Sequence, residues 1–322
     1  MKDNNSKYSF SICKDKEQWD NFIINSPQGN LFCDTKFVDA FQNNCEFIFV
    51  HSGKRVLLGA MIMLDLSNKP SSTPFVYQGI LLDQSILQLS NQKKVKKTLD
   101  LINFLLQEIE QKYQKISFSL HPSLTDLRSF QWHNYHHPEG KHFNLELNYT
   151  AIFDLKVNRS FDKMMMKARA VRRQEYRKCI KEGFTVEESY DVSILDMLHA
   201  KTFDRQGIGR SSGEKFMATT LAQVAISKGF GRLLVCRDKA GMPASASLFL
   251  FDKKTAYYMI GANDPDYRNY GTSSFVIFEQ LRKCLEQGLD QIDFMGINSP
   301  NRGDFKTSFG AIPTPYYHAN FV

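Results

Sequence analysis

The sequence predicts an α/β (α+β) protein of two tandem lobes, each a mixed central sheet flanked by helices. Its 322 residues amount to more than one domain of the usual length, roughly 150 residues. Hydrophobic residues make up 42% of the chain and charged residues 23%, a balance typical of a globular protein with a packed core. The same order of three strands, a helix and a further strand occurs in both halves. We therefore expect an N-terminal lobe at residues 1–155 and a C-terminal lobe at residues 156–322.

The spacing of apolar residues predicts the elements of the first lobe. Alternation indicates strands, and apolar residues three or four apart indicate helices. The expected elements are a strand at Tyr8–Cys13, helices near Lys16–Ile24 and Thr35–Gln42, strands at Phe47–Val50, Arg55–Leu66 and 75–83, a long amphipathic helix at Asn91–Tyr113 and a strand at 115–122.

The second lobe follows the same order. Its expected elements are strands at 232–238, 244–252 and 255–264, a helix from about Ser273 to Gln287 that ends at Gly288, and a strand at 291–298. Duplication of one α/β unit explains the matching order. A chance resemblance between ordinary strands is the alternative.

The most basic segment of the chain, Arg159–Glu182, lies between the lobes. Apolar residues recur in it near helical spacing, which predicts a linking helix at about 160–182 with one apolar seam and a cationic outer face. That face is either a solvated surface or a site that attracts a polyanion, such as a phosphorylated substrate or a tRNA. Its contacts with phosphate groups would weaken as the salt concentration is raised.

Charge, cysteine usage and hydropathy exclude several protein classes. Lysine and arginine (41) exceed aspartate and glutamate (34), a mild excess that suits an anionic partner without selecting one. The six cysteines form no CxxC pair, which argues against a zinc ribbon or a disulfide framework. The N-terminus has no apolar signal core, and no apolar stretch approaches the roughly 20 residues that cross a bilayer. We expect a cytoplasmic protein without an integral membrane segment.

A turn at Tyr267–Ser274 joins a predicted strand to a predicted helix. It places Arg268, Gly271, Thr272 and Ser273 at the helix start, where backbone N–H groups attract anions and glycine lets a ligand approach the main chain. These residues are candidates for binding the phosphates of an acyl donor. A tight turn that only caps the helix is the alternative.

Several motifs together resemble a known family. YRNYGTSS, at 267–274, is similar to the pyrophosphate loop of GNAT-type N-acyltransferases. With RRQEYRKCIKEGF, HAKTFDRQG, the strand pair ASASLFLF and AYYMIGAND, and FMGINSPNRGDFKTSFGAIPTPYY, the chain resembles the FemABX peptidoglycan-bridge aminoacyltransferases, which have two GNAT-like lobes, and the related BioF2-like acetyltransferases. The resemblance covers about Tyr149–Tyr317 and extends more weakly over the N-terminal lobe.

The resemblance implies roles for individual residues. It places Phe305 and Lys306 beside the acceptor amine, where the ammonium group of Lys306 would stabilise the oxyanion formed when the amine attacks an acyl carbon. It makes Arg205 an anchor for an anionic substrate, and it places Lys36 in the substrate groove, although the surroundings of Lys36 depart from the family's Trp-bearing motif. A surface charge for Lys306 and a helix-terminal ion pair for Arg205 are the alternatives.

Asp293 and Tyr258 lie on predicted neighbouring strands and can face the acyl site. Asp293 would act as a base through water and Tyr258 as a proton donor. A tyrosine in the core with a satisfied hydroxyl is the alternative for Tyr258.

We expect neither a metal site nor a permanently bound cofactor. The histidines of QWHNYHHPEGKH lack metal-ligand spacing and fit a polar loop. No G-x-S-x-G or Walker motif occurs. The chain also lacks the long helical insertion by which several FemABX proteins hold tRNA, so the acyl donor is either an aminoacyl-tRNA or an acyl-CoA.

These observations predict an N-acyltransferase that transfers an aminoacyl or acyl group to an amine of an anionic cell-envelope precursor, such as a muropeptide or a nucleotide-linked amino sugar. One alternative is an acyl-CoA-dependent N-acetyltransferase of a sugar or small metabolite. The other is a non-catalytic binding module on the duplicated fold.

Overall fold

A computed structural model describes residues 7–41, 44–65, 67, 69–70 and 75–321. The chain divides into unit 1, Met1–Asn148 with Pro315–Val322, and unit 2, Tyr149–Thr314. The long strands β6 (Phe143–Asp154) and β12 (Ile312–Phe321) each contribute residues to both units. No helix among the described residues is both long and apolar enough to span a membrane.

Unit 1 contains a sheet of order β1-β2-β3-β4 and a second, antiparallel pairing of β5 with the end of β12. Its elements are β1 Ser9–Cys13, α1 Lys16–Asn25, η1 Leu31–Cys33, α2 Thr35–Ala40, β2 Asn44–Ser52, β3 Arg55–Leu64, β4 Ile80–Leu82, η2 Gln84–Ile86, α3 Asn91–Lys112, β5 Ile116–Ser119 and α4 Arg128–Gln131.

Two apolar clusters form the interior of unit 1. In one, the amphipathic helix α3 buries Leu101, Leu105 and Ile109 against strand residues of this unit. In the other, the fully buried ring of Trp19 stacks on Phe47, with 4.5 Å between ring centroids. Buried aromatic side chains such as these contribute large apolar areas to folding.

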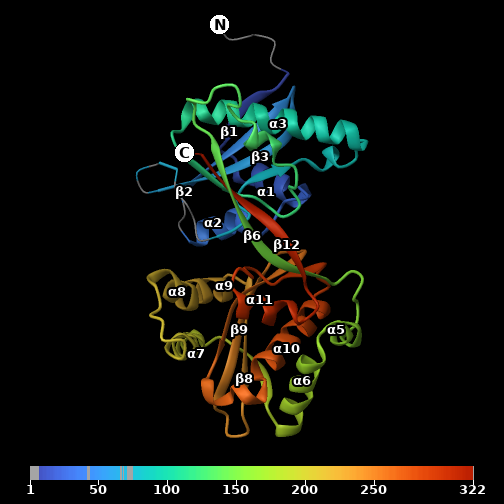
Figure 1. Cartoon of the computed structure of the whole chain (residues 1–322), viewed down its shortest axis with the longest axis vertical. Helices are drawn as coiled ribbons and strands as arrows, with labels where there is room; N and C mark the ends of the chain where they lie inside the picture. The colour runs from blue at the N-terminus through green and yellow to red at the C-terminus, as the bar shows by residue number, and fades with distance from the viewer. Residues whose placement is uncertain (1–6, 42–43, 66, 68, 71–74, 322) are drawn as a thin grey trace. The chain divides into compact units, whose positions relative to one another are not determined.

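Unit 2 is built on a sheet whose strand order is β6-β11-β10-β9-β8-β7. Its other elements are α5 Phe161–Lys167, α6 Ala170–Glu182, β7 Thr185–Ser189, α7 Val192–Asp204, α8 Ser212–Phe216, η3 Met217–Leu221, α9 Ala222–Ser227, β8 Gly231–Arg237, β9 Pro243–Phe251, β10 Thr255–Asn263, η4 Pro265–Tyr270, α10 Thr272–Glu286, β11 Gln291–Asp293 and α11 Pro300–Thr307. Within this unit, α7, α8 and α9 lie on one side of the sheet, and α5, α6 and α10 lie on the other (Figure 1).

The pairing of β10 with β11 sets the position of the candidate site. The two strands are parallel and pair only over Thr255–Tyr257 and Gln291–Asp293, whereas β10 continues to Asn263 beside β9. A bulge between Tyr258 and Ile260 shifts the register of β10 just after the pairing ends. The carboxyl ends of parallel strands are the usual place for a ligand site in α/β sheets.

The predicted elements recur in the predicted order, with differences of extent. Gln42 and Leu66, at the ends of two predicted elements, lie outside the described residues. The linking helix is in fact two helices, α5 and α6, because Ala168 has an extended backbone with ψ 150°. The strands β6 and β12 were not predicted. Because the end of β12 belongs to unit 1, a single boundary between residues 155 and 156 does not separate the two units.

Candidate functional site

Lys306 is a buried cation of unit 2. It lies in the last turn of α11, and only 9% of its surface is exposed. Its ammonium group donates to the carbonyl oxygens of Met295 at 3.3 Å and Gly296 at 3.4 Å, and it lies 4.9 Å from the centre of the Tyr258 ring. Burial, reinforced by the charge of Arg302, lowers the pKa of Lys306 to about 7, because a low-dielectric interior disfavours the charged form.

The two carbonyl groups that face Lys306 belong to a strained turn after β11. Met295 has φ 55°, a left-handed conformation that costs a non-glycine residue about 1–3 kcal/mol. The Asp293 carboxylate holds this turn, since it accepts from the Met295 N–H at 2.7 Å and from the Thr150 hydroxyl. Asp293 is 2% exposed. These contacts favour a positioning role for Asp293, in addition to the role as a base that the sequence predicts.

Tyr258 lies between the ammonium group and the core. Its ring packs against Phe249 and Phe294, and burial raises the pKa of its hydroxyl, so the hydroxyl keeps its proton at neutral pH. The hydroxyl reaches Gly261, where an added Cβ would lie 1.8 Å from the tyrosine oxygen. Glycine at 261 therefore leaves room for this hydroxyl.

Gly261→Ala is expected to lower kcat about tenfold or more, because the Tyr258 ring must move and its hydroxyl is our candidate proton donor. Adding the same change to a Tyr258→Phe variant should lower kcat further only slightly, since the two changes affect one group. Gly209→Ala is the control, because no atom lies within 4 Å of its added Cβ. Equal kcat for the Gly261→Ala variant and the unmodified protein would contradict this role of Tyr258.

His199 belongs to the same electrostatic neighbourhood and was missed in the sequence. The positive charge of Arg302 acts on all three groups: it adds to the burial that lowers the pKa values of His199 and Lys306, and it opposes the burial that raises the pKa of Tyr258. His199 is 8% exposed, and its Nδ1 has no hydrogen-bond partner among the described residues. Burial first, and then Arg210, lowers its pKa. The available signal was a histidine on the buried seam of α7, next to Leu198.

Arg205, the predicted substrate anchor, ends the same helix. It is the exposed C-cap residue of α7 and forms no ion pair within the described part of the chain, so the guanidinium group is available to an anion. Lys201 of α7 pairs with Asp264, whose carboxylate also caps η4 by accepting from the Asp266 N–H. This contact connects α7 to the turn that carries Arg268.

The predicted phosphate-binding turn lies at the start of α10. Arg268 is exposed, Gly271 is the N-cap residue with φ 78°, and Ser273 is partly buried. Thr272 is buried, and its hydroxyl has no partner among the described residues. The glycine is required, because a Cβ there would lie 2.4 Å from the side chain of Glu175 on α6.

An ion pair on α6 links this turn to the candidate catalytic helix. Arg172 donates to both Glu175 oxygens, at 2.7 and 3.0 Å, and to the Ser308 hydroxyl at 2.8 Å. Its guanidinium group also lies 4.8 Å from the ring centre of Phe305, the residue before Lys306. Nothing in the sequence pattern singles out this pair, because its partners are about a hundred or more positions away.

Lys36, the remaining predicted residue, belongs to unit 1. It is exposed on α2, where its backbone N–H is capped by the Asp34 carboxylate at 2.8 Å. Its role in a substrate groove stays a prediction.

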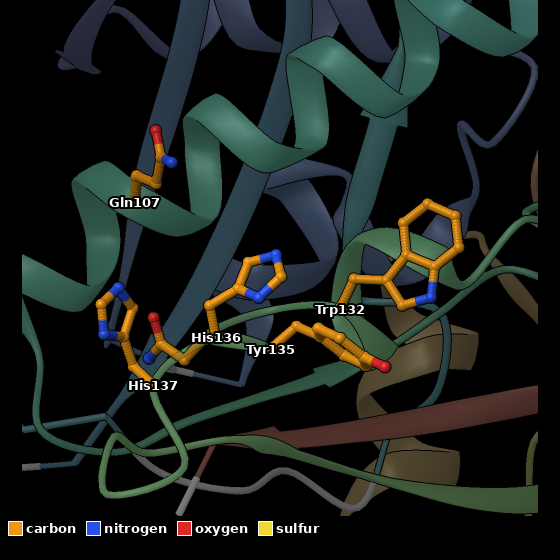
Figure 2. A pocket seen from close by; sticks show the side chains of 6 residues that line it. Gln107, Trp132, Tyr135, His136 and His137 are labelled. Atoms are coloured by element: carbon orange, nitrogen blue, oxygen red, sulfur yellow. The ribbon is translucent and has the colours of Figure 1, made fainter.

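Unit 1 also has an open pocket of about 560 Å³, lined by Gln107, Trp132, Asn134, Tyr135, His136 and His137 (Figure 2). None of the predicted site residues lines it. Across the described residues, no group of three or more His, Cys, Asp or Glu side chains could hold a metal ion. All six cysteines are free, and burial raises the pKa of the Cys179 and Cys284 thiols to about 12 and about 11.

Comparisons with known proteins bear on both fold and site. Residues 166–307 match the model of the acetyltransferase (GNAT) domain family. A crystal structure of FemX is 14% identical with a TM-score of 0.71 over 96% of both chains. A tandem GNAT protein from the clavulanic acid biosynthesis pathway is 10% identical with a TM-score of 0.54, over 97% of this chain and 98% of that one.

A third similar structure is the C-terminal domain of a putative lysylphosphatidylglycerol synthetase from Agrobacterium fabrum. It is 13% identical with a TM-score of 0.50, over 95% of this chain and 90% of that one. No curated protein sequence matches the chain.

These matches confirm the predicted fold of two tandem GNAT-like lobes and its likeness to FemX. The match to an acetyltransferase domain confirms the prediction of an acyltransferase. All of the candidate residues in unit 2, from Arg205 to Lys306, lie within the matched segment.

Proposed function

We propose that this GNAT-fold acyltransferase, FemX-like in structure, transfers an aminoacyl or acyl group to an amine of an anionic cell-envelope precursor, a muropeptide or a nucleotide-linked amino sugar. The observation that carries the proposal is Lys306, a buried ammonium group held where the β10–β11 pairing ends, with a pKa lowered to about 7. The FemABX-like motifs support the class of acceptor. A cytoplasmic location, where such precursors are built, is part of the proposal.

In the proposed reaction, the amine nitrogen attacks the acyl carbon and forms the new C–N bond. The ammonium group of Lys306 stabilises the oxyanion of the tetrahedral intermediate. As this collapses, the bond from the acyl carbon to the donor's oxygen or sulfur breaks, and the Tyr258 hydroxyl supplies a proton to the leaving atom. Asp293, through water, accepts the proton that the amine loses, and a proton then returns to Tyr258 through solvent.

Exposed cations are proposed to hold the substrates. Arg205 and Arg268 are exposed in unit 2, and a guanidinium group suits phosphate or carboxylate through paired hydrogen bonds. The basic helices α5 and α6 would attract an anionic carrier, a tRNA among the possibilities, in a salt-dependent way. Lys36 of unit 1 is proposed to contact the acceptor.

Mass spectrometry of precursors tests the proposal. An extract of envelope precursors is incubated with the purified protein and either aminoacyl-tRNA or acetyl-CoA. We expect one added acyl mass on an amine-bearing precursor with the unmodified protein and with Lys283→Met, a surface control on α10, but not with Lys306→Met.

Two other outcomes would contradict the proposal. Acyl transfer from acetyl-CoA to a sugar or small metabolite alone would favour the N-acetyltransferase alternative, which the acetyltransferase domain match supports. No added mass with either donor on any acceptor would favour a binding module.

A further inference from the structure

The first turn of α10 already carries an anion. Helix starts attract anions because their backbone N–H groups have no partner within the helix and the helix dipole is positive there. In this chain the Glu175 carboxylate of α6 lies against that turn. The Ser274 hydroxyl in the first turn donates to it, and a Cβ at Gly271 would lie 2.4 Å from both Cβ and Cγ of Glu175 and 2.9 Å from its carboxyl carbon.

This carboxylate is held in place. Arg172 binds both of its oxygens, at 2.7 and 3.0 Å, and Arg172 is itself bonded to Ser308 and packed on the Phe305 ring. The side chains of Arg172 and Glu175 are only 17% and 24% exposed. An anion that enters the turn must therefore displace a carboxylate that is bonded on two sides and partly withdrawn from solvent.

We propose that Glu175 is a specificity-determining residue that excludes diphosphate groups from the start of α10 and so disfavours acyl-CoA as a donor. A diphosphate at Gly271 would meet a fixed negative charge, and like charges at contact distance repel strongly where water is partly excluded. Arg172, whose guanidinium group also contacts Ser274 of that turn, is neutralised by Glu175. The Thr272 hydroxyl, buried without a partner among the described residues, is a donor that a bound group could use once the carboxylate is removed.

The inference rests on the proposed acyl transfer and refines it. The donor that this site accepts is one that places no diphosphate at the α10 turn, as an acyl ester does. Arg268, exposed just before the turn, is free to bind a phosphate that lies farther out. Discrimination by repulsion of the wrong ligand is a common way to obtain specificity.

Binding of acetyl-CoA, measured by calorimetry on the full chain, tests the inference without any need for turnover. We expect Glu175→Gln to bind acetyl-CoA at least tenfold more tightly than the unmodified protein. Glu182→Gln, which removes an exposed carboxylate from the same helix, should bind as weakly as the unmodified protein. S-acetylpantetheine, which lacks the diphosphate, should bind all three proteins alike.

A second variant covers the case in which Glu175→Gln does not fold. Ser274→Ala removes the hydroxyl that holds the carboxylate at the turn, and we expect it to tighten acetyl-CoA binding by a smaller factor. Acetyl-CoA binding that is equally tight in the unmodified protein and in whichever variant folds would overturn the inference.

The same proteins separate this inference from the proposed function. Acyl transfer from an ester donor by the unmodified protein, without any gain of acetyl-CoA binding in Glu175→Gln, would refute only the role of Glu175. A gain of binding, without acyl transfer from any donor, would refute only the proposed function.

Discussion

Lys306→Met is expected to lower kcat for acyl transfer by about 100- to 1000-fold, the loss that follows removal of one oxyanion-stabilising donor. Methionine keeps the length and apolar contacts of the lysine stem, so the change removes the ammonium group with little change of packing. Single-turnover measurements with saturating acceptor report the chemical step directly. Lys283→Met, on the exposed surface of α10, should keep full activity.

The pH dependence of the unmodified protein adds a second readout to this prediction. Because the pKa of Lys306 is about 7, the fraction of ammonium form falls about tenfold per pH unit above that value. The Lys306-dependent part of kcat/KM should fall with it, and the residual rate of Lys306→Met should not show this alkaline decrease. If Lys306→Met kept the rate of the unmodified protein, Lys306 would take no part in the reaction.

The same variant is expected to be more stable than the unmodified protein at pH 6. Burial lowers the pKa of Lys306 from its ordinary 10.5 to about 7 in the folded state, a difference that corresponds to on the order of 5 kcal/mol. Loss of the contacts with the Tyr258 ring and the two carbonyl groups offsets part of the stability gained by removing the buried charge. We expect Lys306→Met to raise the free energy of unfolding at pH 6 by about 2–4 kcal/mol.

The size of this effect falls with rising pH in a defined window. Below pH 7 the lysine is charged in both the folded and the unfolded chain, so the folded state carries the whole penalty of the buried charge. Between pH 7 and 10.5 the unfolded chain binds more protons, and the stability contributed at this site rises with pH.

Urea unfolding at pH 6, 8 and 10 should therefore show the gain from Lys306→Met shrinking as pH rises. Lys283→Met, whose side chain is 46% exposed, should show no such trend. A gain that is constant across this range would mean that Lys306 has an ordinary pKa.

A gain of stability together with a loss of activity would identify Lys306 as a residue kept for function. A buried, incompletely solvated ammonium group destabilises the fold, and a strained Met295 is retained beside it. Strain and buried charge commonly occur together at functional sites. A merely structural lysine would be expected to lower stability when it is replaced.

Some residues of the candidate site could be recognised in the sequence, and others could not. The FemABX-like motif that contains Phe305 and Lys306 and the strands that carry Tyr258 and Asp293 were recognisable because each is a continuous pattern in the sequence. The structure brings Lys306, Tyr258 and the turn after Asp293 together. The sequence did not predict that the Asp293 carboxylate would be bonded to Thr150 of β6, because β6 itself was not predicted.

The features of the site that the sequence did not predict depend on contacts between segments that are distant in the sequence. His199 has no distinguishing local motif, and only folding places it in reach of the Arg302 charge. The turn at Gly271 looks from sequence like an open anion site, but a carboxylate from α6 lies on it. Whether such a turn is empty depends on a side chain almost a hundred residues earlier.

By itself, the sequence determined most of the helices and strands and their two-lobed order, because apolar periodicity and turn residues act over a few neighbouring residues. The resemblance of its motifs to the FemABX proteins implied the acyltransferase class. Only the tertiary structure decided that Lys306 is buried over Tyr258, that Asp293 holds a turn, and that Glu175 occupies the start of α10. Burial, pKa and charge pairing depend on which distant segments meet, and packing alone sets those properties.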